Sequence, residues 1–473
     1  MEWEGFDLKA LFGIVGYRYL WKGLELLTIL ILARLLPIKD FSIAFIAMSL
    51  IYLLQSFMKL NYREKDSKKI KKFYNALSIV APITGSIIAG IIFILSISII
   101  PLQYIEAFKL SAVILLLSSF ILTPKTFFLN RNELKKLYRS YAIAQVFTTI
   151  LIVSLALSDL GYKAVLYGYI VFYLGNTVML WELFPFKLKA TVNKDMIGKI
   201  FLIWKENLAS TTISALLYYT VLFYTALFFS LSDFAILFMA LTIGYFLYEN
   251  ITIFINSLII PKFIEMEENE NYELFRYNLV RVMEYFSLKI VPISLILIVL
   301  ARQVLEIGFK WNFGTDTLTL IIFAGMLKAI CETTRIVFIS KARFNIIGRI
   351  KYLELIILLL GLIIFVKLFG FLGIALAITI SSVLSSLMYL LVGARITRLN
   401  LITVSRDYFY IFFSGVMAAL CIGLIKELFF IKTLFSLIIL IIFGELIYVW
   451  ISFVFNKELY KRFVKFIFSL MEE

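Results

Sequence analysis

The 473-residue chain contains no histidine and only two cysteines, Cys331 and Cys421. The absence of histidine excludes imidazole acid–base chemistry and removes the commonest metal ligand. Both cysteines lie in apolar stretches, so we expect neither a disulfide framework nor a zinc site. The sequence therefore predicts no bound metal, no cofactor and no catalytic residues of these kinds.

Charged residues are scarce, at 16%, whereas hydrophobic residues make up 62% of the chain. A soluble domain is roughly half apolar. Long apolar stretches recur throughout the sequence, and short alternating segments of the kind found in membrane β-barrels are absent. The first apolar stretch contains Arg18 and Lys22 and lacks a small-residue cleavage site, so it is expected to be a retained span.

These patterns predict an all-α polytopic membrane protein of about 14 transmembrane helices. The expected spans are residues 10–36, 40–60, 74–99, 105–127, 138–158, 162–184, 200–230, 233–260, 283–306, 316–340, 350–368, 371–394, 407–428 and 433–455. Lysine and arginine gather in alternate connections, such as 61–72, 125–139 and 341–351. The positive-inside rule then places both termini in the cytoplasm of a cell whose cytoplasmic (inner) membrane holds the protein.

The net charge of +15 follows from these cytoplasmic loops, which face anionic lipid. We therefore expect membrane lipids as partners and no nucleic acid. The last segment, 456–473, is amphipathic and too charged to span, and it is expected to lie on the cytoplasmic face as an interfacial helix. The acidic stretch within 262–282 is expected to be a solvated connection, either helical or irregular.

The chain repeats itself. Between Asp40–Leu50 and Asp233–Ile243, five of eleven positions are identical at an offset of 193: aspartate, phenylalanine, isoleucine, phenylalanine and alanine. The repeat continues at offsets of 209 or 210, in the pairs Pro82/Pro292, Thr123/Thr333, Phe128/Phe338 and Gly161/Gly370.

Six helices in each copy is an even number, so both copies enter the membrane in the same direction. They are expected to be related by a pseudo-two-fold axis along the membrane normal. The predicted organisation is an N-lobe over 1–190, a C-lobe over 191–399, two extra helices over 400–455 and the tail over 456–473. Two parallel lobes favour a carrier that works by alternating access. The alternative is a duplicated scaffold that transports nothing.

Two stretches resemble those of a known family. ARLLPIKDFSIAFIAMSL (33–50) is similar to the junction of the first two helices of polysaccharide flippases. FGFLGIALAITISS (369–382) is similar to a late Gly- and Ala-rich helix of the same proteins. The chain thus resembles the multidrug/oligosaccharidyl-lipid/polysaccharide (MOP) exporter superfamily, and within it the Wzx-type flippases. It departs from the family pattern at Pro37–Ile38 and Phe41–Ser42, where the family has Gly-Pro and Phe-Gly.

Charged residues inside membrane helices are costly, so they usually face a partner or a cavity. The first span carries Arg18, Lys22 and Glu25 on one helical face, and the tenth carries Lys328, Glu332 and Arg335 at the same i, i+4, i+7 spacing. One interpretation is a net-positive cavity between the lobes. The other is internal salt bridging, with Glu25 paired to Lys22 and Glu332 paired to Lys328 or Arg335.

Further candidates follow from polar stripes on other spans. A cavity would bind an anionic headgroup, and we assign this role to Arg18, Lys22, Lys205, Lys328 and Arg335. The cavity carboxylates are Glu25, Glu249 and Glu332, and Glu249 is the leading candidate for binding a coupling Na⁺ or H⁺. The predicted glycan contacts are Tyr52, Asn207, Tyr245 and Asn256.

The resemblance and the charge pattern together favour a monomeric flippase for polyprenyl-(di)phosphate-linked oligosaccharide, which makes and breaks no bond. A cation-coupled multidrug exporter is the alternative on the same fold, but its cavity should be net acidic. A lipid II flippase is a close variant of the first hypothesis. A membrane glycosyltransferase or polymerase is disfavoured, because every predicted outside loop is short.

Overall fold

The computed structural model describes residues 8–58, 67–98, 104–131, 133–186, 194–255, 259–399, 401–428 and 432–455, together with Lys457 and Lys461. The chain divides into two compact units, Gly5–Ala235 and Ile236–Glu473, called here the N unit and the C unit. The predicted lobe boundary near residue 190 was drawn from the sequence repeat and remains a prediction. Most of the predicted interfacial tail, 456–473, lies outside the described residues.

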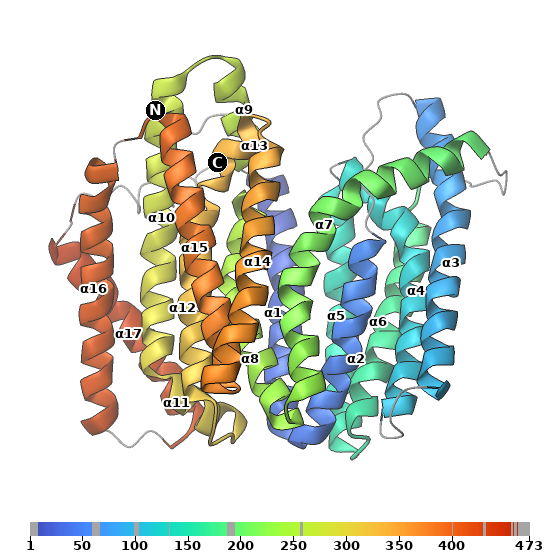
Figure 1. Cartoon of the computed structure of the whole chain (residues 1–473), viewed down its shortest axis with the longest axis horizontal. Helices are drawn as coiled ribbons and strands as arrows, with labels where there is room; N and C mark the ends of the chain where they lie inside the picture. Colours follow the sequence, from blue (N-terminus) through green and yellow to red (C-terminus); the bar gives the residue numbers. More distant parts are fainter. Residues whose placement is uncertain are drawn as a thin grey trace. The chain divides into compact units, whose positions relative to one another are not determined.

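The regular elements of the described residues are helices (Figure 1). The first seven are α1 (Leu8–Leu35), α2 (Ile38–Phe57), α3 (Ser67–Ser98), α4 (Ile105–Asn130), α5 (Leu134–Leu157), α6 (Tyr162–Glu182) and α7 (Lys194–Phe228). The next seven are α8 (Leu231–Phe254), α9 (Ile260–Glu268), α10 (Tyr272–Val299), α11 (Ala301–Gln303), the π-helix η3 (Val304–Phe309), α12 (Thr315–Glu332) and α13 (Arg335–Ser340). The last four are α14 (Phe344–Phe369), α15 (Leu372–Thr397), α16 (Leu401–Leu428) and α17 (Leu434–Phe455).

Every predicted span overlaps at least one helix, and the tenth is divided between α12 and α13. This confirms the all-α membrane class. In the part of the chain that is described, 10 helices are long and apolar enough to cross a membrane. Helices α7 and α8 hold shorter apolar segments, Ile213–Phe228 and Leu231–Phe246. Helices α1 and α12 carry the predicted charged stripes. The number of membrane crossings, fourteen, therefore remains a prediction.

The two units use the same packing pairs. In the N unit α3 packs on α4, α4 on α6, and α5 on α6. In the C unit the repeat-equivalent pairs α10–α12, α12–α15 and α14–α15 also pack together. Gly161 and Gly370, paired by the repeat, share an unusual backbone conformation with φ of 56° and 59° and ψ of −137° and −135°. The sequence repeat is thus matched by local geometry and by helix pairing.

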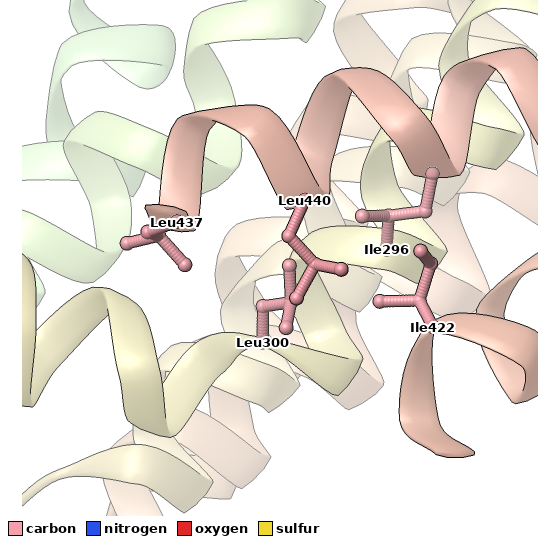
Figure 2. Packing of buried hydrophobic residues seen from close by; sticks show 5 residues of the cluster. All are labelled: Ile296, Leu300, Ile422, Leu437 and Leu440. Atoms are coloured by element: carbon pink, nitrogen blue, oxygen red, sulfur yellow. The ribbon is translucent and has the colours of Figure 1, made fainter. Parts of the chain in front are cut away.

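The two extra helices attach to α10. Figure 2 shows Ile296 of α10 and Leu300, the residue after α10, packed with Ile422 of α16 and with Leu437 and Leu440 of α17. A Cβ added at Gly444 would lie 2.8 Å from the Ile296 side chain, so this glycine permits the close approach of α17. Small residues serve this purpose in membrane helices, where close packing replaces the hydrophobic effect as the driving force.

The predicted tenth span is broken near its C-terminal end. Helix α12 ends at Glu332 and α13 begins at Arg335, with Thr333 and Thr334 between them. Each threonine hydroxyl donates to a backbone carbonyl three residues earlier at 2.6 Å, which competes with regular helical bonding. The repeat-equivalent stretch of α4 contains Pro124 but continues as one helix. The break places a buried carboxylate and a buried guanidinium on either side of a bend.

Helix α13 is fixed at its far end as well. The Lys341 ammonium contacts both carboxylate oxygens of Glu267 on α9, at 2.5 and 2.6 Å. The same ammonium lies 5.1 Å and 5.5 Å from the ring centroids of Tyr272 and Phe275. The acidic connection that the sequence predicts after the eighth span thus includes a short helix that holds α13.

Candidate functional site

A glycine pair brings α8 against α12 in the C unit. A Cβ at Gly325 would lie 1.9 Å from the carbonyl oxygen of Gly244, and one at Gly244 would lie 2.8 Å from that of Ile321. Only glycine permits such backbone contact. As a consequence Tyr245, the residue after Gly244, reaches the charged face of α12, where the Lys328 ammonium lies 5.1 Å from its ring centroid.

Two buried ion pairs occupy this region. The Lys328 ammonium contacts the Glu354 carboxylate of α14 at 2.5 Å, and their side chains are 17% and 6% exposed. The Arg335 guanidinium contacts the Glu332 carboxylate at 2.5 Å across the helix break, with side chains 14% and 5% exposed. Pairing of this kind is what allows charges to be buried, because an isolated buried charge costs several kcal/mol or more.

A fifth charged residue, Lys351 of α14, completes the group. It lies within electrostatic range of all four partners. We call these five residues the C-unit charge cluster: Lys328, Glu332, Arg335, Lys351 and Glu354. It holds three basic side chains and two carboxylates, so it carries one surplus positive charge among the described residues.

Hydroxyl groups surround the Glu332 end of the cluster. Tyr248 and Thr252 of α8 lie beside the Glu332 side chain. Tyr389 of α15 lies close to both Glu332 and Glu354. Phenolic and alcoholic groups can donate to a carboxylate and can equally accept from a neutral acid.

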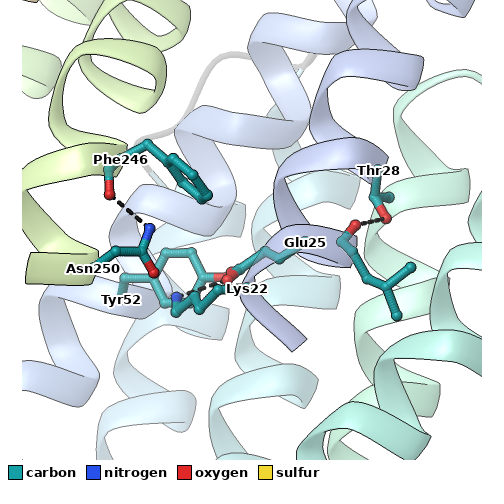
Figure 3. A network of polar contacts seen from close by, with 7 residues as sticks. Lys22, Glu25, Thr28, Tyr52, Phe246 and Asn250 are labelled. Carbon is teal, nitrogen blue, oxygen red and sulfur yellow. Dashed lines mark hydrogen bonds and ion pairs between the residues drawn. The ribbon is translucent and has the colours of Figure 1, made fainter. Parts of the chain in front are cut away.

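The N unit holds a second cluster on α1, shown in Figure 3. Lys22 pairs with Glu25 at 2.7 Å, and Tyr52 of α2 donates to the other Glu25 oxygen at 3.5 Å. Arg18 donates to the Tyr138 hydroxyl of α5, and its guanidinium carbon lies 4.7 Å from that ring centroid. We call Arg18, Lys22 and Glu25 the N-unit charge cluster, and it also holds one more basic group than acidic groups.

Aromatic side chains line this second cluster. The Lys22 ammonium lies 4.5 Å from the Trp21 ring centroid, and Trp21 contacts the Tyr141 ring at 4.8 Å. Tyr52 meets Tyr169 edge to face, and Tyr173 exchanges hydrogen bonds with the Gln55 amide. Aromatic faces and phenolic hydroxyls of this kind can bind the C–H faces and the hydroxyls of sugars.

Two of the remaining predicted site residues are exposed: Lys205 on α7 and Glu249 on α8. Asn207 lies on α7, but its side chain is outside the described residues, as is the whole of Asn256. The two tyrosines chosen as glycan contacts, Tyr52 and Tyr245, are repeat-equivalent, and each touches the charge cluster of its own unit.

Sequence reasoning missed Lys351 and Glu354. They lie seven and ten residues inside α14, ahead of its most apolar part, where they look like ordinary flanking charges. Their i, i+3 spacing was the available signal, but the partnership of Glu354 with Lys328 crosses between helices and cannot be read from spacing. Among the described residues, no group of three or more histidine, cysteine or acidic side chains could hold a metal ion.

A family model described as "Polysaccharide biosynthesis protein" matches residues 31–313, which is more than half of the chain. The chain belongs to this family. Curated protein sequences give no match.

Solved structures show where the fold of this family member recurs. The structure titled "Lipid II flippase MurJ, inward closed conformation" has a TM-score of 0.70 at 14% identity, covering 95% of this chain and 99% of that one. An inward-facing multidrug resistance MATE transporter of the MOP superfamily gives 0.60 at 13% identity, covering 83% and 95%. A mutant of the Vibrio cholerae MATE transporter VcmN gives 0.55 at 11% identity, covering 82% and 95%. The protein is a multi-pass membrane protein with the MOP transporter fold.

Proposed function

We propose that the protein moves polyprenyl-phosphate- or polyprenyl-diphosphate-linked oligosaccharide from the cytoplasmic to the outer leaflet of the cell membrane, by alternating access. The observation that carries this proposal is the chemistry of the two charge clusters. Each lies on helices of the membrane fold, each holds one more basic side chain than carboxylates, and each is bordered by tyrosine.

An anionic headgroup fits this chemistry. Arginine and lysine are the side chains suited to phosphate, and their interactions strengthen where water is excluded. The tyrosine hydroxyls and aromatic faces near Arg18 and Lys22 suit a glycan. The reaction needs no bond made or broken, so no catalytic group is required. We further propose a monomer with both termini in the cytoplasm, driven by a coupling cation.

The surplus positive charge disfavours the multidrug exporter, because cationic drugs require net acidic surroundings. The lipid II flippase stays a close variant, since its substrate also joins a sugar to a lipid through diphosphate. The similarity to the MurJ fold is compatible with that variant. The glycan portion of the substrate distinguishes the two.

A transport assay in proteoliposomes tests the proposal. Polyprenyl-diphosphate oligosaccharide in the inner leaflet should become accessible to an external sugar-binding protein only when the chain is present. The informative variants are Arg18→Gln and Lys351→Gln. Each removes one basic side chain of a cluster and leaves the Lys22–Glu25, Lys328–Glu354 and Arg335–Glu332 pairs in place. Loss of a charge-assisted hydrogen bond costs about 1.5–3 kcal/mol, so each should slow transport by about tenfold or more.

The matched control is Lys136→Gln, which removes a lysine whose side chain is 54% exposed and paired with Glu133. It should transport like the unaltered chain. Full transport by the Arg18→Gln/Lys351→Gln double variant would contradict the assignment of the headgroup to these clusters. Uptake of a cationic dye under an ion gradient, with no movement of the lipid-linked sugar, would favour the multidrug exporter.

A further inference from the structure

Helix α9 lies in the stretch by which the second copy of the repeat is longer than the first. The offset between the copies is 193 at Asp40/Asp233 and 210 at Pro82/Pro292, so the C unit holds 17 more residues between these points. The nine residues of α9, Ile260–Glu268, fall inside this longer stretch. The repeat itself does not require α9, so its role belongs to the C unit alone.

Helix α9 lies against the short helix α13 at one end of the C unit (Figure 1). The face of α9 toward the protein is apolar. Ile260 and Phe263 are buried, and the Phe263 ring meets the Phe275 ring of α10 edge to face at 4.9 Å. On the other face, Glu265 and Glu268 are exposed. Helix α9 is thus an amphipathic surface helix that covers α13.

One ion pair fastens α9 to α13. The Lys341 ammonium donates to both carboxylate oxygens of Glu267, at 2.5 and 2.6 Å, and the side chains are 17% and 23% exposed. Because both side chains keep some contact with solvent, this pair can open at a lower cost than a fully buried one. The rings of Tyr272 and Phe275 also face the ammonium. Ring faces attract a cation, so Lys341 keeps a favourable position when Glu267 moves away.

The position equivalent to Lys341 in the N unit is exposed. At the offset of 210 it is Arg131, which directly follows α4, as Lys341 directly follows α13. Arg131 is exposed, whereas Glu267 of α9 and two rings of α10 cover Lys341. The same basic position is therefore open in one unit and covered in the other, and the cover comes from the longer stretch.

Helix α13 connects this covered surface to the C-unit charge cluster. Arg335 at its start contacts Glu332, and Lys341 follows its last residue. Regular helical backbone ends on both sides of α13, at the break after Glu332 and at Ala342, which has a positive φ of 52°. Between these points Val337 is 0% exposed. The surface under α9 is thus one short helix away from the cluster.

We propose that α9 is a lid over α13, that the Lys341–Glu267 pair is the latch that keeps the lid closed, and that the lid opens to admit the anionic headgroup to the C-unit charge cluster. The inference rests on the proposed function, whose orientation places α9 and α13 on the cytoplasmic side, where the substrate enters. The lid turns about residues 269–271, which join α9 to α10 and include Glu270 with a positive φ of 53°.

A thiol under the lid tests the latch without any substrate. The Cys331→Ala/Cys421→Ala background removes both native thiols, and Val337→Cys then places one thiol on α13. A water-soluble maleimide should label this buried thiol slowly, at a rate that follows the population of the open lid. Adding Glu267→Gln removes the charge of the latch. Loss of one partly exposed ion pair should raise the labelling rate by about two- to fivefold.

Two controls separate opening of the lid from general loosening of the fold. Val291→Cys places a thiol at another valine that is 0% exposed, on α10 beside Gly415 of α16. Its labelling should not change when Glu267→Gln is added. Glu306→Gln removes the carboxylate of the exposed Arg302–Glu306 pair in the same unit. It should leave the labelling of Val337→Cys unchanged.

Transport tests whether the lid has to open. In the same thiol-free background, a short reducible bis-methanethiosulfonate cross-linker joins the two cysteines of Glu267→Cys/Lys341→Cys before the protein is reconstituted in proteoliposomes. Movement of the lipid-linked sugar should stop while the linker is intact and recover after a reductant cleaves it. Each single-cysteine variant, treated with the same reagent, should keep transporting.

Three results would overturn the inference while leaving the flippase proposal intact. They are full transport by the cross-linked chain, unchanged labelling of Val337→Cys when Glu267→Gln is added, and an equal rise in the labelling of Val337→Cys and Val291→Cys. If the double-cysteine variant does not fold, the labelling comparison decides. If Glu267→Gln speeds the labelling of Val337→Cys but the unaltered chain moves no lipid-linked sugar, the lid and its latch stand and the proposed function fails.

Discussion

At the scale of single residues, the Lys328–Glu354 pair shows how strongly a buried charge depends on its partner. Replacement of Lys328 by glutamine would leave the Glu354 side chain, 6% exposed, without its closest cation. Breaking a buried pair in this way costs about 3–5 kcal/mol. We expect Lys328→Gln to lower the thermal unfolding temperature in detergent markedly, and Lys328→Gln/Glu354→Gln to recover most of the loss.

The comparison needs an exposed pair of the same type. Lys136 and Glu133 contact at 2.6 Å with side chains 54% and 36% exposed, and such surface pairs contribute about 0–1 kcal/mol. Lys136→Gln should therefore change the unfolding temperature little. If the double variant were as unstable as Lys328→Gln alone, the cost would come from lost packing of the lysine stem and not from an unpaired carboxylate.

Residue patterns in the sequence predicted only part of the site. The i, i+4, i+7 spacing placed Arg18, Lys22 and Glu25 on one face of α1, and the structure brings Lys22 and Glu25 into contact. The same spacing in the tenth predicted span grouped Lys328, Glu332 and Arg335, and the structure brings Glu332 and Arg335 into contact. The spacing could not predict that Lys328 pairs with Glu354, because this ion pair depends on how α12 and α14 pack. Local periodicity determines which side chains share a face, whereas tertiary packing determines their partners.

At the scale of elements, the two repeat-related glycines offer a matched experiment. Gly161 and Gly370 have φ of 56° and 59°, a conformation that side-chain-bearing residues rarely adopt. A Cβ at Gly161 would also lie 2.8 Å from a carboxylate oxygen of Asp40, whereas one at Gly370 would have nothing within 4 Å.

Both alanine variants should lose stability through backbone strain of about 1–3 kcal/mol. Gly161→Ala should lose more than Gly370→Ala, because its Cβ also displaces Asp40. Thermal unfolding of the two variants, and of Gly161→Ala in an Asp40→Ala background, measures the difference. Equal losses in all three would show that Asp40 can move aside at no cost.

Helix positions were predictable because long apolar runs have few structural options in a membrane. The ends of the helices were less predictable than their positions. The ninth predicted span begins at residue 283, but α10 begins at Tyr272, where the Asn271 side chain accepts a hydrogen bond from the Leu274 N–H and caps the helix. The polar stretch before the apolar run is thus helical. The break at Thr333–Thr334 was equally hidden, because threonine occurs in many unbroken membrane helices.

At the scale of the whole molecule, the repeat gives the two units similar helices but different side chains at equivalent positions. Tyr52 and Tyr245 are equivalent and border the cluster of their own unit. At the offset of 210, Lys351 in the C unit is equivalent to Tyr141 in the N unit. A cation in one unit therefore corresponds to an aromatic ring in the other.

The orientation of the chain in the membrane is also a prediction about the whole molecule. The side on which each loop lies depends on whether the number of spans before it is odd or even. With the N-terminus in the cytoplasm, the exposed Asn269 after α9 lies inside and the exposed Ser158 after α5 lies outside. The chain has two cysteines, so Cys331→Ala/Cys421→Ala provides a background free of thiols. In intact cells a membrane-impermeant maleimide should label Ser158→Cys, and it should label Asn269→Cys only after the membrane is opened. Labelling of both in intact cells would mean that a span between them has been miscounted, because an even number of crossings would then separate two positions that the basic loops place on opposite sides.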